Sequence, residues 1–171
     1  MQKLKSRNRR GFTLMEVLIV VVILGILAAT VLPQFSSSTA NAKESTLKQD
    51  LQLLRSQIQL FRFQHDGMVP NGTAANVVKQ LTLASDLTGT TAAIGTAGFP
   101  FGPYLIGQLP QNPYNAGNGL MVVTGPVSAV AVDPAAMQGT VKVGWILSTD
   151  TGEIKANTVG KTADGIDLDK I

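Results

Sequence analysis

The sequence predicts an α+β protein in which a long N-terminal helix packs its second half on a small antiparallel sheet. Three observations support this prediction: an apolar run at residues 12–32, a helical repeat of apolar residues at 47–61, and β-branched segments toward the C-terminus. The 171 residues are 44% hydrophobic and 15% charged, which suits one folded domain with an appendage and not a disordered chain.

Composition excludes several functional classes. The basic excess is local, because five of the 14 Lys and Arg residues lie at positions 1–10, and the remaining nine face eleven Asp and Glu residues. A basic surface for nucleic acid is therefore not expected, and no nucleic-acid partner is predicted. The chain has no cysteine for a disulfide or thiolate centre, and its single histidine, His65, excludes a multi-histidine metal site.

The apolar run from Phe12 to Leu32 has the length of a membrane-spanning helix. Its 21 residues extend about 31 Å at roughly 1.5 Å each, close to the hydrocarbon thickness of a bilayer. The cations precede the run, so the positive-inside rule predicts that residues 1–11 stay in the cytoplasm and that the chain after Pro33 lies outside it.

Glu16 is the only ionisable residue in this run. A carboxylate near the bilayer centre costs about 2.5–3.5 kcal/mol, and an inert anchor has no need of one, so we expect a partner for it. One alternative is a solvated carboxylate at the membrane interface. For the run as a whole, the alternative is a secretory signal cleaved near Ala29.

Residues 10–17 read RGFTLMEV, and this segment with the apolar helix after it resembles the N-terminus of type IV pilins and type II secretion pseudopilins. The resemblance implies a pilin-like fold and a structural, non-enzymatic role. It implies that a prepilin peptidase cuts between Gly11 and Phe12 and methylates the amino group of Phe12. The implied partners are other copies of the chain, minor pilin-like subunits, an inner-membrane assembly platform and, before assembly, membrane lipid.

Cleavage after Gly11 would place an ammonium four residues before Glu16. In a medium without water an unpaired charge is costly, so the ammonium and the carboxylate favour pairing with each other. They can pair within one helix or between adjacent copies, and pairing between copies would set the axial register of a helical stack. Two further residues are candidates for assembly: Gly25 for close helix packing, although one glycine is little evidence, and Pro33, which either bends the helix or ends the span.

Residues 34–66 form the predicted amphipathic half of the helix. The apolar stripe that should face the core comprises Leu47, Leu51, Leu54, Ile58 and Phe61. Leu53, Leu60 and Phe63 lie beside this stripe and widen it, as expected for a helix packed against a sheet.

An unbroken helix from Phe12 to Gln64 would be about 80 Å long, so we expect its membrane half to protrude from the head. His65 and Gly67 lie at the predicted helix end, Gly67 as the residue that leaves the helix and His65 in a structural role near the last carbonyls.

The head should contain a short helix, a loop at 88–98 and an antiparallel meander of three or four strands. Thr73 is the expected N-cap of the helix, residues 149–152 the turn between the last two strands, and Trp145 a core residue. The predicted helix and strands are 74–87, 120–123, 127–132, 141–147 and 153–156. The predicted organisation is a cleaved basic leader (1–11), a membrane and filament-core helix (12–33), the amphipathic half (34–66) and a globular α+β head (67–171).

Five carboxylates near the C-terminus are candidate ligands for calcium: Asp150, Glu153, Asp164, Asp167 and Asp169. Oxygen ligands suit Ca²⁺, and the resemblance implies a C-terminal calcium loop like that of major pseudopilins. The spacing lacks the twelve-residue EF-hand pattern and its closing glutamate, so a solvated acidic terminus is the alternative. No other cofactor is required.

The leading functional prediction is a type II secretion pseudopilin of the bacterial inner membrane, with its head outside the cytoplasm, that polymerises through its N-terminal helix into a periplasmic filament. One alternative is a type IV pilin of a surface pilus for adhesion, motility or DNA uptake. Another is a membrane-tethered extracytoplasmic binding module or enzyme. The cysteine-free chain favours the pseudopilin, because type IV pilins often close a loop with a disulfide. An enzyme would need a convergent site, which the sequence does not provide.

Overall fold

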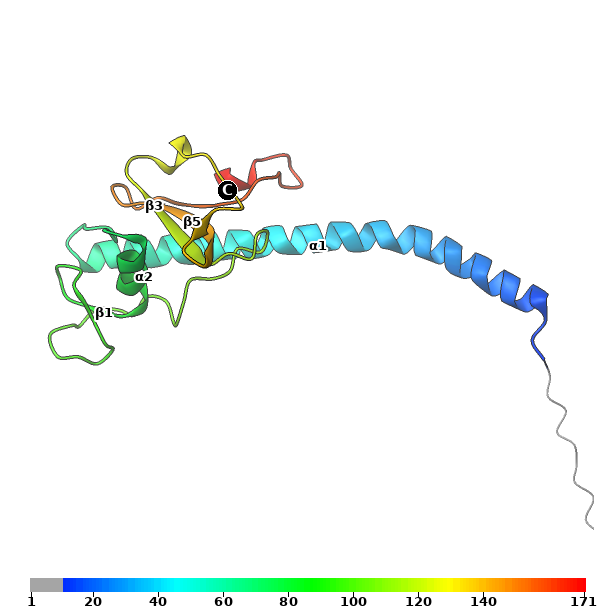
Figure 1. The fold of residues 1–171 in the computed structure, drawn as a ribbon, viewed down its shortest axis with the longest axis horizontal. Helices are drawn as coiled ribbons and strands as arrows, with labels where there is room; N and C mark the ends of the chain where they lie inside the picture. The colour runs from blue at the N-terminus through cyan, green and yellow to red at the C-terminus, as the bar shows by residue number, and fades with distance from the viewer. Residues whose placement is uncertain (1–10) are drawn as a thin grey trace, which may run out of the picture. The chain divides into compact units, whose positions relative to one another are not determined.

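The computed structural model describes residues 11–171, without the side chains of Leu32, Pro33 and Ser36. The predicted basic leader, up to Arg10, lies outside the described residues. The chain divides into two units, one ending at Ala40 and one comprising Asn41–Ile171. Helix α1 (Leu14–Gln64) contributes to both (Figure 1).

In the first unit, the part of α1 before Leu32 has apolar residues on all sides, with Glu16 and Thr30 as exceptions. The segment Leu14–Val31 is long and apolar enough to cross a membrane, as predicted, and none of its residues is buried. Helix α1 continues through Pro33, so this proline does not end the helix.

In the second unit, α1 buries the predicted apolar stripe. The exposed fraction of every residue in the stripe is 0% or 1%: Leu47, Leu51, Leu54, Ile58 and Phe61. The sequence had suggested that the residues beside the stripe widen the surface that faces the core. In the structure they are not part of the core. Leu53 and Leu60 are each 43% exposed and Phe63 is 86% exposed. The head therefore covers a narrower sector of α1 than the width of its apolar surface predicts.

Helix α2 (Ala74–Thr82) begins at the predicted cap, where the Thr73 side chain accepts a hydrogen bond from the Asn76 backbone N at 3.3 Å. It packs Val77 and Leu81 into the core. The helix is shorter than predicted, because Leu83 is extended and leads into a two-stranded antiparallel sheet. That sheet pairs β1 (Ala84–Ser85) with β2 (Thr91–Ala92).

The main sheet is built around one central strand, β5 (Val141–Ser148). The strands β4 (Met137–Gln138) and β6 (Ile154–Ala156) pair with it antiparallel. The strand β3 (Gly119–Val123) pairs with it in parallel. The predicted antiparallel meander is therefore wrong, and the sheet is mixed, although the α+β class is confirmed.

The meander prediction failed because the segment 127–132 is not a strand in the structure. This segment forms a 3₁₀ turn, η1 (Val127–Ala129), after Pro126, and then an irregular loop. Without a strand there, no hairpin returns from β3, and the chain instead crosses over to enter β5 in the same direction as β3.

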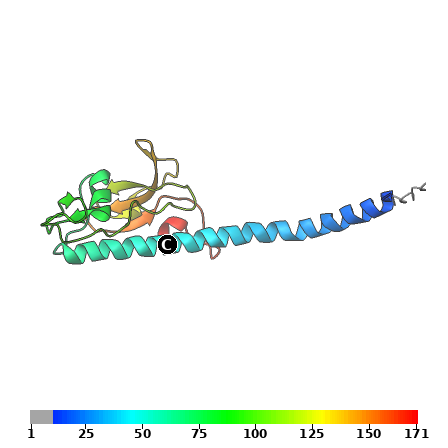
Figure 2. The same ribbon diagram turned by 90° about the horizontal axis from the view of Figure 1, so that it is seen from below.

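The strands lie along one side of the second half of α1 (Figures 1 and 2). Trp145 of β5 is fully buried between the layers, as predicted, and its indole Nε1 donates to the Pro110 carbonyl at 2.8 Å. Leu120 and Leu147 join the same core. The layers form one hydrophobic core that the second half of α1 closes.

Buried asparagines supplement the strand pairing near the start of β5. Asn112 Nδ2 donates to the Gly144 carbonyl at 3.0 Å, and Asn115 Nδ2 donates to the carbonyls of Val143 and Asn157 at 2.9 and 2.8 Å. These amides add hydrogen bonds to backbone oxygens of β5 and of the segment after β6, which holds the loop before β3 against the sheet.

Leu54→Ala should lower the free energy of unfolding of the head by about 2–5 kcal/mol, because it leaves a cavity in the core. The neighbouring change Leu53→Ala should have a much smaller effect, since Leu53 is 43% exposed. Thermal unfolding of both variants tests the packing, and equal losses of stability would contradict it.

Candidate functional site

The first turn of α1 is closed by a reciprocal pair of residues, Thr13 and Glu16. The Thr13 backbone N and hydroxyl donate to Glu16 Oε2 at 2.9 and 3.0 Å, and the Glu16 backbone N donates to Thr13 Oγ1 at 3.2 Å. This is a capping box, in which two side chains satisfy backbone N–H groups that a helix start leaves free. The contact turns the Glu16 carboxylate back toward the N-terminus of its own helix.

The capping box gives the carboxylate a favourable place within a single chain. Negative charge is stabilised at a helix N-terminus, where the macrodipole is positive. Thr13 was not among the candidate residues from the sequence. The pattern threonine, two residues, glutamate at 13–16 is the signal that identifies it.

Gly11 and Phe12 precede the helix and have no regular structure, and Phe12 is 88% exposed. The peptide bond between them is therefore in an accessible segment, which suits proteolysis. At Gly25, apart from its chain neighbours and the backbone of its own helix, no atom lies within 4 Å of the position that a Cβ would take. A second helix could therefore approach this point closely.

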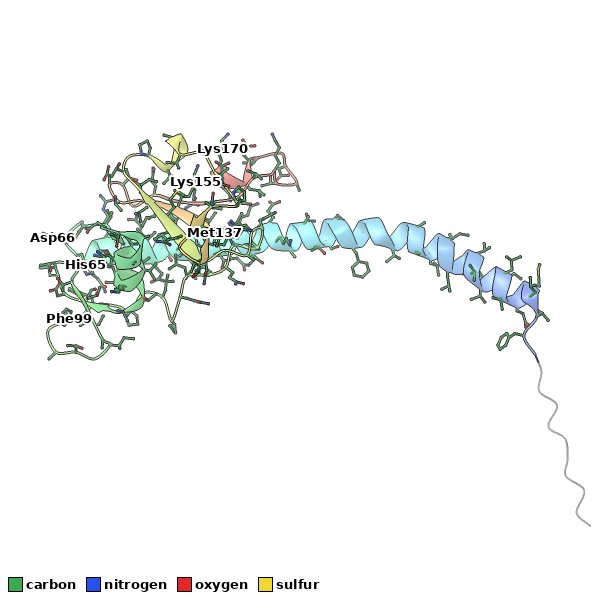
Figure 3. The ribbon with its side chains drawn as sticks, viewed as in Figure 1. His65, Asp66, Phe99, Met137, Lys155 and Lys170 are labelled. Carbon is green, nitrogen blue, oxygen red and sulfur yellow. The ribbon has the colours of Figure 1, made fainter. Side chains whose placement is uncertain are left out.

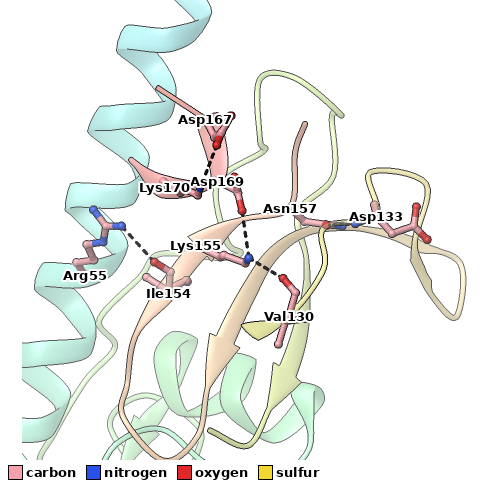
Figure 4. A network of polar contacts seen from close by, with 9 residues as sticks. All are labelled: Arg55, Val130, Asp133, Ile154, Lys155, Asn157, Asp167, Asp169 and Lys170. Atoms are coloured by element: carbon pink, nitrogen blue, oxygen red, sulfur yellow. Dashed lines mark hydrogen bonds and ion pairs between the residues drawn. The ribbon is translucent and has the colours of Figure 1, made fainter. Parts of the chain in front are cut away.

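Two of the acidic candidates, Asp167 and Asp169, pair with lysines (Figure 4). Asp169 pairs with the buried ammonium of Lys155 at 3.3 Å. Asp167 pairs with Lys170 at 2.7 Å and with Lys161 at 3.7 Å. The hydrogen bond from Lys170 lowers the pKa of Asp167, and the same contact raises the pKa of Lys170.

The other three candidates lie apart from a common centre. Asp150 Oδ2 accepts from the Gly125 backbone N at 2.9 Å, Glu153 lies between β5 and β6, and Asp164 lies in the exposed C-terminal loop. Within residues 11–171, no three acidic or histidine side chains gather where they could hold a metal ion. In the structure the candidate calcium ligands Asp150, Glu153, Asp164, Asp167 and Asp169 are not gathered around one point, and the carboxylates of Asp167 and Asp169 are paired with lysines.

Lys155 is the centre of this polar network. Its Nζ donates to the Val130 carbonyl at 2.8 Å as well as to Asp169, and its side chain is only 6% exposed. Beside it, Arg55 of α1 donates to the backbone oxygens of Ile154 and Ile171. These contacts fasten the C-terminal 3₁₀ turn, η2 (Leu168–Lys170), to β6 and α1.

His65 has a structural setting at the opposite end of the head from Lys155 and Lys170 (Figure 3). It is buried, its Nδ1 contacts the Phe61 carbonyl at 2.8 Å and its Nε2 contacts Ser85 Oγ at 3.1 Å. Its ring stacks on Phe61 with centroids 3.7 Å apart. Both ring nitrogens are occupied by the fold, which agrees with the structural role expected for this histidine.

Comparison with known proteins identifies relatives through the N-terminal segment. Residues 6–32 match the family model described as the prokaryotic N-terminal methylation motif. The chain is 30% identical to the type II secretion system core protein G of Dickeya chrysanthemi over 113 residues, which cover 65% of this chain and 67% of that protein.

Two further relatives match over shorter segments. The core protein G of Pseudomonas aeruginosa is 41% identical over 59 residues, which are 34% of this chain and 42% of that protein. The type IV major pilin protein PilA of Myxococcus xanthus is 48% identical over 52 residues, which are 30% of this chain and 23% of that protein. No solved structure matches the chain.

Lys155→Met should lower the free energy of unfolding by about 1–3 kcal/mol, because the Val130 carbonyl loses its donor while Asp169 loses its cation. The matched change Lys161→Met should leave the melting temperature nearly unchanged, since the Lys161 side chain is 67% exposed. Thermal unfolding compares the two, and a Lys155→Met protein as stable as the parent would show that the network does not hold the C-terminal turn.

Proposed function

The chain belongs to the family of pilins and pseudopilins with an N-terminal methylation motif, whose members are structural proteins and not enzymes, and on this premise we propose that it is a subunit of a type II secretion pseudopilus. The observation that carries the proposal is the apolar first half of α1, which has no buried residue in Leu14–Val31. The capping box at Thr13 and Glu16 marks where this helix begins.

The apolar surface of this helix is stable only when lipid or another apolar surface removes it from water. Exposed apolar surface costs roughly 25 cal/mol per Å² in water, and here bulky side chains such as Leu18, Ile23 and Leu27 are each about half exposed. Lipid covers the helix while the subunit waits in the inner membrane, with its head outside the cytoplasm. After extraction, only the equivalent helices of other copies offer an apolar surface of the same length.

Processing between Gly11 and Phe12 prepares the helix for assembly. The cut leaves the Thr13 backbone N–H and hydroxyl in place, so the cap on Glu16 survives in the mature chain. It adds a methylated ammonium at Phe12, a charge that a neighbouring copy's Glu16 can pair with. Hydrophobic burial then holds the filament together, and this charge pair sets the stagger between copies.

The proposed partners follow from this cycle: the prepilin peptidase, the inner-membrane assembly platform, minor pilin-like subunits and other copies of the chain. The match to the core protein G relatives favours the secretion system. The match to the Myxococcus pilin supports a second candidate, a type IV pilin of a surface pilus.

Protein extracted from the membrane of cells with a prepilin peptidase should begin at Phe12 and carry one additional methyl group. Intact-mass spectrometry measures both changes at once, with a Gly11→Leu variant as the unprocessed control. An uncut parent chain, or a chain cut near Ala29, would contradict the filament role and support a tether or a secretory signal.

Glu16→Val should leave the head folded and the protein in the membrane while filament yield falls sharply, because the ammonium of a neighbouring copy loses its partner. Glu16→Gln separates capping from charge, since glutamine still completes a capping box but cannot form the ion pair. We expect both variants to fail in assembly, measured as filaments sheared from cells. Normal yield from Glu16→Gln would show that the charge does not set the register.

A further inference from the structure

The ammonium of Lys155 contacts two segments of the head that lie far apart in the sequence. Its Nζ donates to the Val130 carbonyl at 2.8 Å, in the loop between β3 and β5, and to the Asp169 carboxylate at 3.3 Å, in the C-terminal turn η2 (Figure 4). The Lys155 side chain is only 6% exposed. A buried positive charge therefore lies between a carbonyl and a carboxylate oxygen, which are the kinds of ligand that a hard metal cation takes.

The middle of the loop between β3 and β5 depends on this contact. We call residues 124–136 the crossing loop. Toward its end, the Asp133 backbone N donates to Asn157 Oδ1 at 2.8 Å, and Asn157 Nδ2 donates to the Asp133 carbonyl at 2.6 Å. In the described part of the chain, the only hydrogen bond to residues 126–132 from outside the crossing loop is the one that Lys155 donates.

The charges of the C-terminal segment balance without a metal ion. Three lysines and three aspartates occur between positions 155 and 170, which gives a formal charge of zero: Lys155, Lys161, Lys170, Asp164, Asp167 and Asp169. Calcium takes six to eight oxygen ligands, and its affinity depends on how many of them are charged. In the described residues Lys155 already occupies the point where two such oxygens meet, and no cluster of three acidic side chains offers another. The residues present therefore do not fit the calcium ion that the family resemblance implies.

The three lysines differ in how much they contribute. The side chains of Lys161 and Lys170 are 67% and 69% exposed, and exposed ion pairs add little to stability. Lys155 is buried, so its removal would leave the Asp169 carboxylate and the Val130 carbonyl without their donor. Lys155 is therefore the cation on which the C-terminal segment depends.

We infer that the ammonium of Lys155 is a built-in cation that holds the crossing loop to the C-terminal turn, and that the head of this chain folds without calcium. A cation that is covalently part of the chain does not dissociate, so the stability of the head does not depend on the concentration of a free ion. The inference goes beyond the proposed function, because it concerns the head of each single subunit.

Thermal unfolding of the full-length protein in detergent tests the independence from calcium. Trp145 is the only tryptophan and is fully buried in the head, so its fluorescence reports unfolding of the head. We expect the same melting temperature in millimolar calcium chloride and in excess chelator. A higher melting temperature in calcium would overturn the inference, because an ion that binds the folded state stabilises it.

The role of the ammonium is tested with Lys155→Ala. This change removes three carbons and the nitrogen, which are the heavy atoms of a propylammonium ion. The melting temperature should fall, and propylammonium chloride should raise it again relative to sodium chloride at the same concentration. The parent, measured in both salts, gives the nonspecific effect of propylammonium. Lys161→Ala, at an exposed position, should melt and respond to the two salts as the parent does.

The outcomes decide between the cation and a merely space-filling side chain. A Lys155→Ala protein that melts at the parent's temperature, or that responds to propylammonium no more than the parent, would overturn the role of the ammonium. If Lys155→Ala does not fold, the response of the parent to calcium decides the inference by itself. None of these measurements involves assembly, so their results and a failure of the filament role are distinguishable.

Discussion

The structure depends on one constraint: an apolar helix that its own chain does not bury. Within the first unit, every described side chain from Gly11 to Val31 is exposed, whereas the second unit encloses a complete core around Leu51, Leu54 and Ile58. A chain of this kind is incomplete by itself, because the hydrophobic effect demands a cover for the exposed half. Under the proposed function, lipid covers this half before assembly and the helices of other copies cover it in the filament.

The capping box explains how a carboxylate can be carried on this helix. Glu16 is bonded to Thr13 through three hydrogen bonds, so it does not enter the apolar surroundings unsatisfied. The same position places the carboxylate at the tip of the helix, where the ammonium of a processed neighbour would reach it. Under the proposed function, a residue that is costly for an inert anchor is useful for assembly.

The head stabilises its C-terminal segment with internal cations. Lys155 connects Val130 of the crossing loop with Asp169, and Arg55 reaches the same region from α1 (Figure 4). The carboxylates of Asp167 and Asp169, which the sequence suggested as metal ligands, are paired within the chain. Their spacing in the sequence does not distinguish these two uses, because both place oxygens near a positive charge.

Local patterns in the sequence determined the long helix, its buried stripe, the cap at Thr73 and three of the strands, since periodicity and capping act between residues a few positions apart. The methylation motif at 10–17 determined the family in the same way. Only the tertiary structure decided that β3 and β5 run parallel, that Leu53 and Leu60 stay exposed, and that Lys155 pairs with Asp169. Each of these depends on which distant segments of the chain pack together. The β-propensity of a segment and the polarity of a side chain are local properties and do not determine that pairing.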